Sequence, residues 1–254
     1  MTFGEECTMI LRALCSVHLV AFSWMFLILA ISPLYAQDPA YDPANFSTGT
    51  VKVFGKNCKP TGTGGDPYLN ELKNRDRAPG TYEPVPLSDI LTKWESDFPA
   101  GKGKSHYRLG PKSVWSDAER KAVTAYEKKG ISVEGYLIAI KPQSAEACNC
   151  EIKQFHDYHL WLSESPVPNP PPKHPDKSTS IVVEISPRLI AAHPGWNQKA
   201  INHLIRQHSK IRISGWVTWD EEHPEQIGKE RATLWEVHPI HKIEVYSNGQ
   251  WTEL

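Results

Sequence analysis

Five segments in the second half of the chain are candidate strands, and in the first, second and fourth of them alternate residues form an apolar face. Because successive side chains of a strand point to opposite faces of a sheet, this alternation predicts strands. Between the third and fourth segments, apolar residues recur at helical spacing, which predicts an amphipathic helix over 197–207. The five predicted strands lie at 131–139, 156–162, 180–186, 210–219 and 232–246, the last with Pro239 inside it as a candidate break.

This order of elements predicts a mainly β fold with minor α, namely an OB-like five-stranded barrel with its helix between the third and fourth strands. Gly135 and Gly215 lie in mid-strand, where a closed barrel bends sharply. A second helix is predicted at 117–128, because a capping box begins at Ser116. The barrel domain is therefore placed at 116–254. A plain α+β sheet domain has a similar element order and stays open as an alternative.

The beginning of the chain has the layout of a signal peptide. Arg12 precedes an apolar run at 19–31, and the small residue Ala36 follows it. The run is shorter than the ~20 residues of a typical membrane span. We therefore expect residues 1–36 to be cleaved near Ala36 and the mature protein to be periplasmic or secreted. An uncleaved membrane anchor is the alternative.

Residues 37–115 are rich in glycine, proline and charge, and they predict an irregular N-terminal extension. Within it we expect only a short strand at 50–54 and a short helix at 87–94. No segment after residue 36 is apolar enough to cross a membrane. Removal of Arg12, Glu5 and Glu6 from 28 basic and 29 acidic residues leaves 27 of each, so the global basic excess that favours a polyanion partner is absent.

Several short blocks carry a resemblance to a known family. Taken together, they resemble a family of exported bacterial proteins with an OB-like C-terminal domain and no assigned activity, over roughly residues 58–246. The resemblance implies a compartment and a fold and transfers no catalytic residue. The blocks are DPYLNELKNR at 66–75, CNC at 148–150, DYHLWL at 157–162, GWVTWD at 215–220 and LWEVHPIHKIEV at 234–245.

Three polar residues interrupt otherwise apolar strands and are candidate metal ligands. They are His159, Glu184 and His238. Nitrogen and carboxylate ligands from separate strands can converge on zinc or another divalent metal. Asp220 and His223, in the loop after the fourth strand, are candidates for a further ligand.

The alternative for these residues is structural: hydrogen bonds satisfy the histidines, and Glu184 pairs with Arg188 or Arg231. A cluster of Asp157, Glu184 and Arg188, of the kind that OB-type nucleases place around a metal, can also be drawn, although the spacing does not demand it. The chain has no phosphate loop, nucleotide fingerprint or serine-nucleophile elbow. The one cofactor candidate is therefore zinc or another divalent metal.

Three cysteines remain after residues 1–36, namely Cys58, Cys148 and Cys150. In an oxidising compartment an odd number leaves one disulfide and one thiol, or indicates a metal, since cysteines two apart can chelate a soft metal. A bond between Cys148 and Cys150 is disfavoured because so short a loop strains the bond. We therefore predict that Cys58 pairs with Cys148 or Cys150, closing a loop of about ninety residues and stabilising the fold by ~2–4 kcal/mol.

Tryptophans and arginines are the candidate ligand-binding residues. Some strand tryptophans must fill the core, and any outside it would form a stacking platform for a base or a sugar ring. No acidic residue occurs between Ile185 and Trp219, so a basic face is expected there, with a solvated surface as the alternative. The candidates are Trp161, Trp216, Trp219, Trp235, Arg188 and Arg212.

The first functional hypothesis is an extracytoplasmic, non-enzymatic binding or interaction module. Because of the expected export, an envelope protein or a glycan ranks above nucleic acid as its partner. The second hypothesis is a metal-dependent hydrolase of the phosphodiesterase or nuclease type that uses His159, Glu184 and His238. The third is a structural component of the envelope.

Overall fold

The computed structural model describes residues 51–53, 56–94, 112, 115–190 and 192–254. The signal-peptide prediction for 1–36, and the start of the predicted extension, lie outside these residues. Among the described helices, none has the length and apolar character that a membrane span requires.

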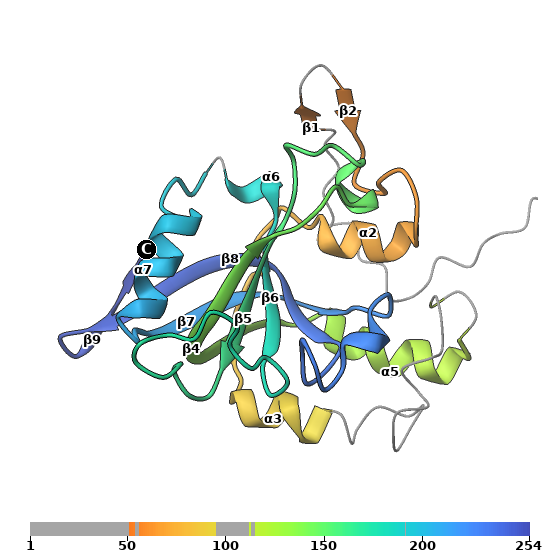
Figure 1. Cartoon of the computed structure of the whole chain (residues 1–254). Coiled ribbons are helices and arrows are strands. Elements are labelled where there is room, and N and C mark those ends of the chain that lie inside the picture. Colours follow the sequence, from red (N-terminus) through yellow and green to blue (C-terminus); the bar gives the residue numbers. More distant parts are fainter. Residues whose placement is uncertain (1–50, 54–55, 95–111, 113–114, 191) are drawn as a thin grey trace, which may run out of the picture. The chain divides into compact units, whose positions relative to one another are not determined.

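Five long strands form a closed barrel, as the alternation predicts (Figure 1). The main sheet has the order β3-β4-β5-β6-β8-β7, and β4 also pairs with β7, which closes it. The pairs are antiparallel except β3–β4 and β6–β8, which are parallel. This is the strand connectivity of an OB fold. The barrel strands are β4 (Gly130–Pro142), β5 (Tyr158–Ser163), β6 (Ile181–Ile185), β7 (Lys210–Trp219) and β8 (Trp235–Ser247).

Two glycines mark the points where the barrel strands crowd one another. A Cβ on Gly135 would lie 2.7 Å from the carbonyl oxygen of Ser163, and one on Gly215 would meet the carbonyl oxygen of Pro239. β8 runs through Pro239 without the break considered from the sequence. The ladder with β7 is irregular there, since Gly215 pairs with Ile240 and Val217 with Val237. Pro239, which has no N–H to donate, is therefore left out of the regular pairing.

Both predicted long helices are present. α5 (Asp117–Glu127) begins with the capping box of Ser116 and Glu119, and α7 (Gln198–Arg206) is capped by the side chain of Asn197. α7 lies against β4. The short helix expected at 87–94 is α3 (Leu87–Leu91).

Several short elements complete the described fold. β1 and β2 form a hairpin, which corresponds to the single strand expected at 50–54, and β9 extends the sheet beside β8. The short elements are β1 (Val51–Val53), β2 (Lys56–Cys58), α2 (Pro67–Lys73), β3 (Glu83–Pro84), α6 (Pro187–Ile190) and β9 (Gln250–Glu253).

Helix α2 is an element that periodicity alone missed. The Asp66 side chain accepts hydrogen bonds from the N–H groups of Tyr68 and Leu69, and Pro67 occupies the first helical position. The helix is only seven residues long, too short for an apolar stripe to repeat. Lys73 is its last residue, and Arg75 follows after the C-cap residue Asn74.

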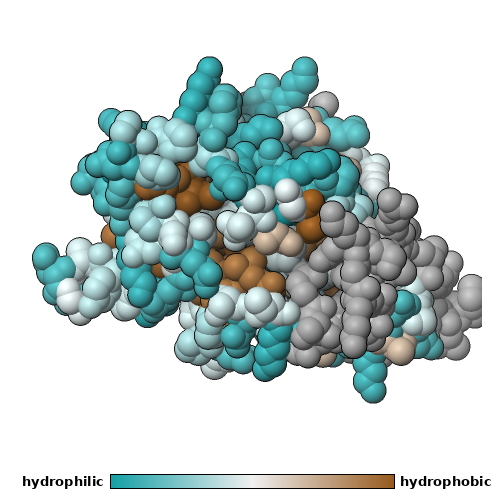
Figure 2. All heavy atoms as spheres, turned by 60° about the horizontal axis from the view of Figure 1, so that its bottom comes forward, coloured by the Kyte–Doolittle hydropathy of each residue, from teal (hydrophilic) through white to brown (hydrophobic). Residues whose placement is uncertain are grey.

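Residues from before the barrel also pack into its core. The ring of Trp94 lies 5.6 Å from that of Trp235, and the ring of Trp115 lies 6.5 Å from that of Trp219. These residues belong to one continuous apolar cluster with the barrel strands. The face in Figure 2 is mostly hydrophilic, with hydrophobic side chains in small areas between the polar ones. The rings of Trp94, Trp115, Trp219 and Trp235 therefore pack in the core.

Candidate functional site

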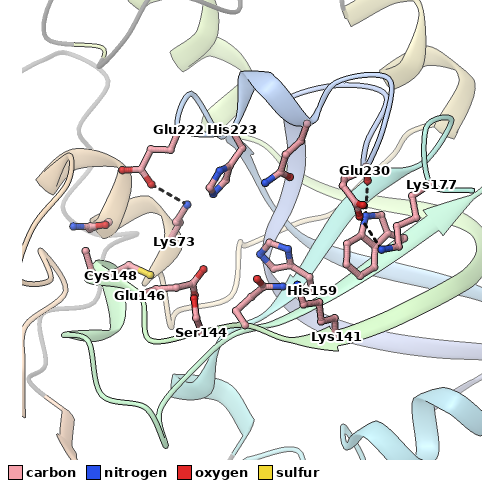
Figure 3. A pocket seen from close by; sticks show the side chains of 15 residues that line it. Lys73, Lys141, Ser144, Glu146, Cys148, His159, Lys177, Glu222, His223 and Glu230 are labelled. Atoms are coloured by element: carbon pink, nitrogen blue, oxygen red, sulfur yellow. Dashed lines mark hydrogen bonds and ion pairs between the residues drawn. The ribbon is translucent and has the colours of Figure 1, made fainter. Parts of the chain in front are cut away.

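A polar pocket of about 510 Å³ lies where the loop between β4 and β5 meets the loop between β7 and β8 (Figure 3). OB folds bind their ligands with these two loops and the neighbouring second and third strands. The lining residues come from four regions: Asn70 and Lys73 from α2; Lys141, Gln143, Ser144, Glu146, Ala147 and Cys148 from the end of β4 and its loop; His159, Trp161 and Lys177 from β5 and the β5–β6 loop; and Glu222, His223, Gln226 and Glu230 from the β7–β8 loop.

Behind the pocket wall, three neighbouring segments bring two carboxylates and an imidazole together. Asp157 precedes β5, Glu184 lies on β6 and His238 lies on β8, and their exposed fractions are 1%, 2% and 0%. The strand register explains the meeting, because β6 runs parallel to β8 with Val183 opposite Val237. The next residues along, Glu184 and His238, are therefore neighbours.

The contacts of this cluster reach the pocket wall. His159 Nε2 lies 2.7 Å from Glu184 Oε1, and Cys148 Sγ lies 3.7 Å from Asp157 Oδ2. His238 Nδ1 lies 3.5 Å from Glu184 Oε2, and His238 Nε2 lies 3.9 Å from Asp157 Oδ2. The cluster is thus separated from the pocket by the side chains of His159 and Cys148.

A second set of charges adjoins the first. Arg231 Nη1 contacts Asp220 Oδ2 at 3.1 Å and Glu236 Oε1 at 2.5 Å. Lys73 Nζ lies 3.3 Å from Asp220 Oδ1, and Glu236 Oε2 lies 3.6 Å from His238 Nδ1. The last contact joins the two sets into one charged cluster beneath the pocket.

Negative charge exceeds positive charge in this cluster. Although burial opposes it, the negative charge of Asp220 raises the pKa of Lys73, so Lys73 stays cationic. Burial lowers the pKa of His238 to about 3, so its imidazole is neutral. The cluster contains four buried carboxylates and two buried cations, namely Asp157, Glu184, Asp220 and Glu236 against Lys73 and Arg231.

The excess of negative charge acts on the pKa values of the acids. Burial, together with the charge of Glu146, raises the pKa of Asp157, and burial together with Glu236 raises the pKa of Glu184. Burial raises the pKa of Glu236 to about 7. Asp220 differs, because the charges of Lys73 and Arg231 outweigh its burial and hold its pKa well below the ordinary value.

Several atoms of the cluster have no hydrogen-bond partner within the described part of the chain. They include both ring nitrogens of His238 and Oδ1 of Asp157. Buried polar groups are nearly always hydrogen-bonded to protein or to ordered water, so these atoms are where a water molecule or an ion would bind. Asp157, Glu184 and His238 offer donor atoms within 4.8 Å of one another, and Glu146, Cys148 and Asp157 form an overlapping set.

The three metal ligands predicted from the sequence meet in this cluster. His159 contacts Glu184, and Glu184 contacts His238. Among the described residues, Glu184 forms no direct ion pair with Arg188 or Arg231, because Arg231 binds Asp220 and Glu236, and Arg188 donates to Asn74 Oδ1 at 2.7 Å.

The loop candidates Asp220 and His223 divide between the cluster and the pocket. Asp220 is held by Lys73 and Arg231, whereas His223 lines the pocket and lies 3.9 Å from Asp220 Oδ2. Lys73 and Glu236 were not among the residues predicted from the sequence. Glu236 could have been found in the same way as Glu184, because each is a charged residue among the apolar residues of a buried strand.

The candidate ligand-binding residues lie mostly elsewhere. The four strand tryptophans are 1–4% exposed, so they present no open stacking face. Trp161 alone among them lines the pocket, with Lys177 Nζ 3.9 Å from its ring centroid. Arg212 is bound by Glu244 and stacks over Trp251, and Arg188 is part-buried beside Asn74.

The cysteine prediction is confirmed. Cys58 and Cys150 form a disulfide with Cα atoms 5.6 Å apart and 92 residues of sequence separation. Cys148 is the free thiol and is buried. The bond ties β2 to the loop that forms one side of the pocket, where Cys58, Ile152 and Phe155 make a small apolar cluster.

No family model and no curated protein matches this chain. A solved structure, "Crystal structure of yeast Stn1 and Ten1", is similar over 79% of this chain and 78% of that chain, with 11% identity and a TM-score of 0.33. At that TM-score the likeness supports no assignment of function.

The fold and the position of the pocket correct one expectation. An envelope protein or a glycan was expected from the sequence ahead of nucleic acid. The pocket lies at the loops and strands with which OB folds bind oligonucleotides as well as oligosaccharides. The preference against nucleic acid is therefore wrong.

Proposed function

We propose that this protein is an OB-fold binding module whose polar pocket binds a phosphate group of its ligand. The macromolecular ligand that we propose is a short single-stranded oligonucleotide. The observation that carries the proposal is the position of the pocket between the β4–β5 and β7–β8 loops. Its volume of about 510 Å³ is within the range of small-molecule sites.

The charges of the pocket support a phosphate. Lys73, Lys141 and Lys177 approach it from three different segments. Lys141 is exposed and forms no ion pair within the described part of the chain. Lys177 is paired with Glu230, whose side chain is 51% exposed, and Lys73 is paired with Glu222, 38% exposed, and also with the buried Asp220. A phosphate can displace such solvent-exposed carboxylates at small cost, because exposed ion pairs contribute little.

Fluorescence anisotropy with labelled single-stranded oligonucleotides, beside a mononucleotide, tests this proposal. We expect log K to fall with log[salt] by about 0.7 per phosphate contacted. Lys141→Gln should weaken binding, whereas the control Lys199→Gln, an exposed lysine on α7, should not. Equal affinity for wild type and Lys141→Gln, or salt-independent binding, would overturn the assignment of a phosphate.

Metal-dependent hydrolysis of a phosphodiester is a second candidate. The observation that favours it is His159, which lines the pocket and contacts Glu184 of the buried cluster at 2.7 Å. A divalent cation bound by Glu184 would polarise a substrate oxygen if the side chains of His159 and Cys148, which separate the cluster from the pocket, moved aside. Manganese-dependent cleavage of bis(p-nitrophenyl) phosphate that Glu184→Gln abolishes would support the candidate, and metal-independent cleavage would refute it.

We further propose that the protein is exported, as a member of the bacterial family that the sequence blocks resemble. We also propose an extension over 37–115 followed by a barrel domain over 116–254. The Cys58–Cys150 disulfide supports export, because such bonds persist in oxidising compartments. N-terminal sequencing of the secreted chain tests cleavage after Ala36, and limited proteolysis tests the boundary near 115.

A further inference from the structure

We propose that Asp157, Glu184 and His238 bind one transition-metal dication, such as Zn²⁺ or Mn²⁺, beneath the floor of the pocket. The site stands independently of what the pocket binds, and the hydrolytic candidate rests on it. Two carboxylates and one imidazole are a donor set that proteins use for these metals.

The geometry is compatible with a single ion. The donor atoms of the three residues lie within 4.8 Å of one another. Metal–ligand bonds of about 2.0–2.2 Å place neighbouring donors roughly 3–4 Å apart, a spacing that small side-chain rotations reach from here. The donors are held by strands β6 and β8 and the start of β5, which are joined by backbone hydrogen bonds.

The donor atoms are in a state that suits a cation. His238 is fully buried, and neither of its ring nitrogens has a hydrogen bond within the described residues. Oδ1 of Asp157 likewise has no hydrogen bond within the described residues. A cation accepts electron pairs from these atoms, so one ion satisfies a histidine nitrogen and both carboxylates together.

The charge of the cluster points to the same conclusion by a separate argument. Its four buried carboxyl groups face two buried cations, Lys73 and Arg231, so two of the carboxyl groups either hold a proton or need a further cation. Buried charges are ordinarily paired or coordinate metals. One dication neutralises this excess.

Outer contacts orient the donors. His159 holds Glu184 Oε1 at 2.7 Å, and the side-chain amide of Asn149 donates to Asp157 Oδ2 at 3.0 Å. Hydrogen bonds of this kind fix the ligands of known metal sites. Glu146 and Cys148, which form the overlapping set with Asp157, stand on the pocket side and can complete the shell.

The test begins with the untagged mature chain purified without chelators. Elemental analysis should find about one transition-metal ion per chain, or the stripped protein should bind one equivalent of Zn²⁺, Mn²⁺ or Co²⁺ in calorimetric titration. Failure of all three metals to bind stoichiometrically would overturn the proposal.

Matched variants locate the ion. Asp157→Asn and His238→Gln should abolish stoichiometric binding, whereas His241→Gln and Glu244→Gln, on the same strand as His238 but outside the cluster, should retain it. Undiminished binding in the first two variants, with a folded circular dichroism spectrum, refutes the site.

A measurement on the wild type covers the case in which His238→Gln does not fold. Addition of Zn²⁺ should shift the ¹⁵N resonances of the His238 ring and leave those of His241 unchanged. Unchanged His238 resonances at one equivalent of bound zinc would place the ion elsewhere and refute the proposal.

Discussion

Strands β5, β6 and β8 are buried on both faces around the charged cluster, and at that point the two faces differ chemically. Leu160, Val183 and Val237 are 0% exposed and belong to the apolar core. Their immediate neighbours along the chain are His159, Glu184 and His238, which are also buried but lie in the charged cluster. Because adjacent strand residues point to opposite faces, one strand set separates an apolar interior from a charged one.

The chemical difference between the two faces determines what each contributes to the stability of the fold. The apolar face gains free energy from removal of its side chains from water. The charged face is covered by α2 and the two pocket loops, and desolvation of unpaired charge costs free energy unless a partner compensates it. The apolar face is therefore a source of stability, and the charged face is where we propose that a metal ion binds.

The largest expected effect is on the apolar face. Leu160→Ala should lower the free energy of unfolding by about 2–5 kcal/mol, because it leaves a cavity among fully buried side chains. Urea denaturation of the oxidised protein measures it. A loss below that range would mean that the core around Leu160 collapses to fill the space, and Lys199→Gln serves as the neutral control.

The next largest effect on the unfolding free energy concerns the disulfide that holds the β4–β5 loop over the charged face. Cys58→Ser removes the disulfide with Cys150 and should lower the free energy of unfolding by about 2–4 kcal/mol. A reducing agent should produce the same loss in the wild type and no further loss in the variant. Additional destabilisation of the variant by the reductant would contradict the single-bridge assignment.

A smaller effect is expected from pH at the edge of the charged face. Burial lowers the pKa of His241 to about 4, whereas an unfolded histidine titrates near 6.5. Between these values the unfolded chain binds the extra proton, so this contribution is complete above about pH 6.5 and is lost as the pH falls towards 4. At pH 5 the loss should be about 2 kcal/mol at most.

His241→Gln isolates that contribution. The difference in unfolding free energy between wild type and variant, measured from pH 7 to pH 4.5, should shift in favour of the variant as the pH falls. A difference that is constant across this range would show that His241 titrates normally in the folded protein.

The smallest expected effect is that of Asp157→Asn on the unfolding free energy, and its sign depends on whether metal is present. In the presence of a chelator, Asp157→Asn removes one of the uncompensated charges and should leave the unfolding free energy unchanged or raise it by about 1 kcal/mol. With saturating metal the variant should be less stable than the wild type, since only the wild type gains binding free energy. Destabilisation by several kcal/mol in chelator would show that Asp157 is already compensated without an ion.

The strand order, the two long helices and the partners open to Cys58 were all predictable from the sequence, because each depends on local spacing or on a small number of candidates. The alternation of β5 was also read correctly as a strand. What the alternation does not report is whether the polar face meets water, and here it does not.

Only the tertiary structure decided that the polar face is buried and what surrounds it. Lys73 comes from a helix too short to show periodicity, Arg231 from a loop and Glu236 from a distant strand. Their meeting depends on barrel closure and on the parallel register of β6 with β8, which are non-local contacts. The sequence by itself therefore determined the barrel and named His159, Glu184 and His238, whereas the charge balance around them exists only once these distant segments pack together.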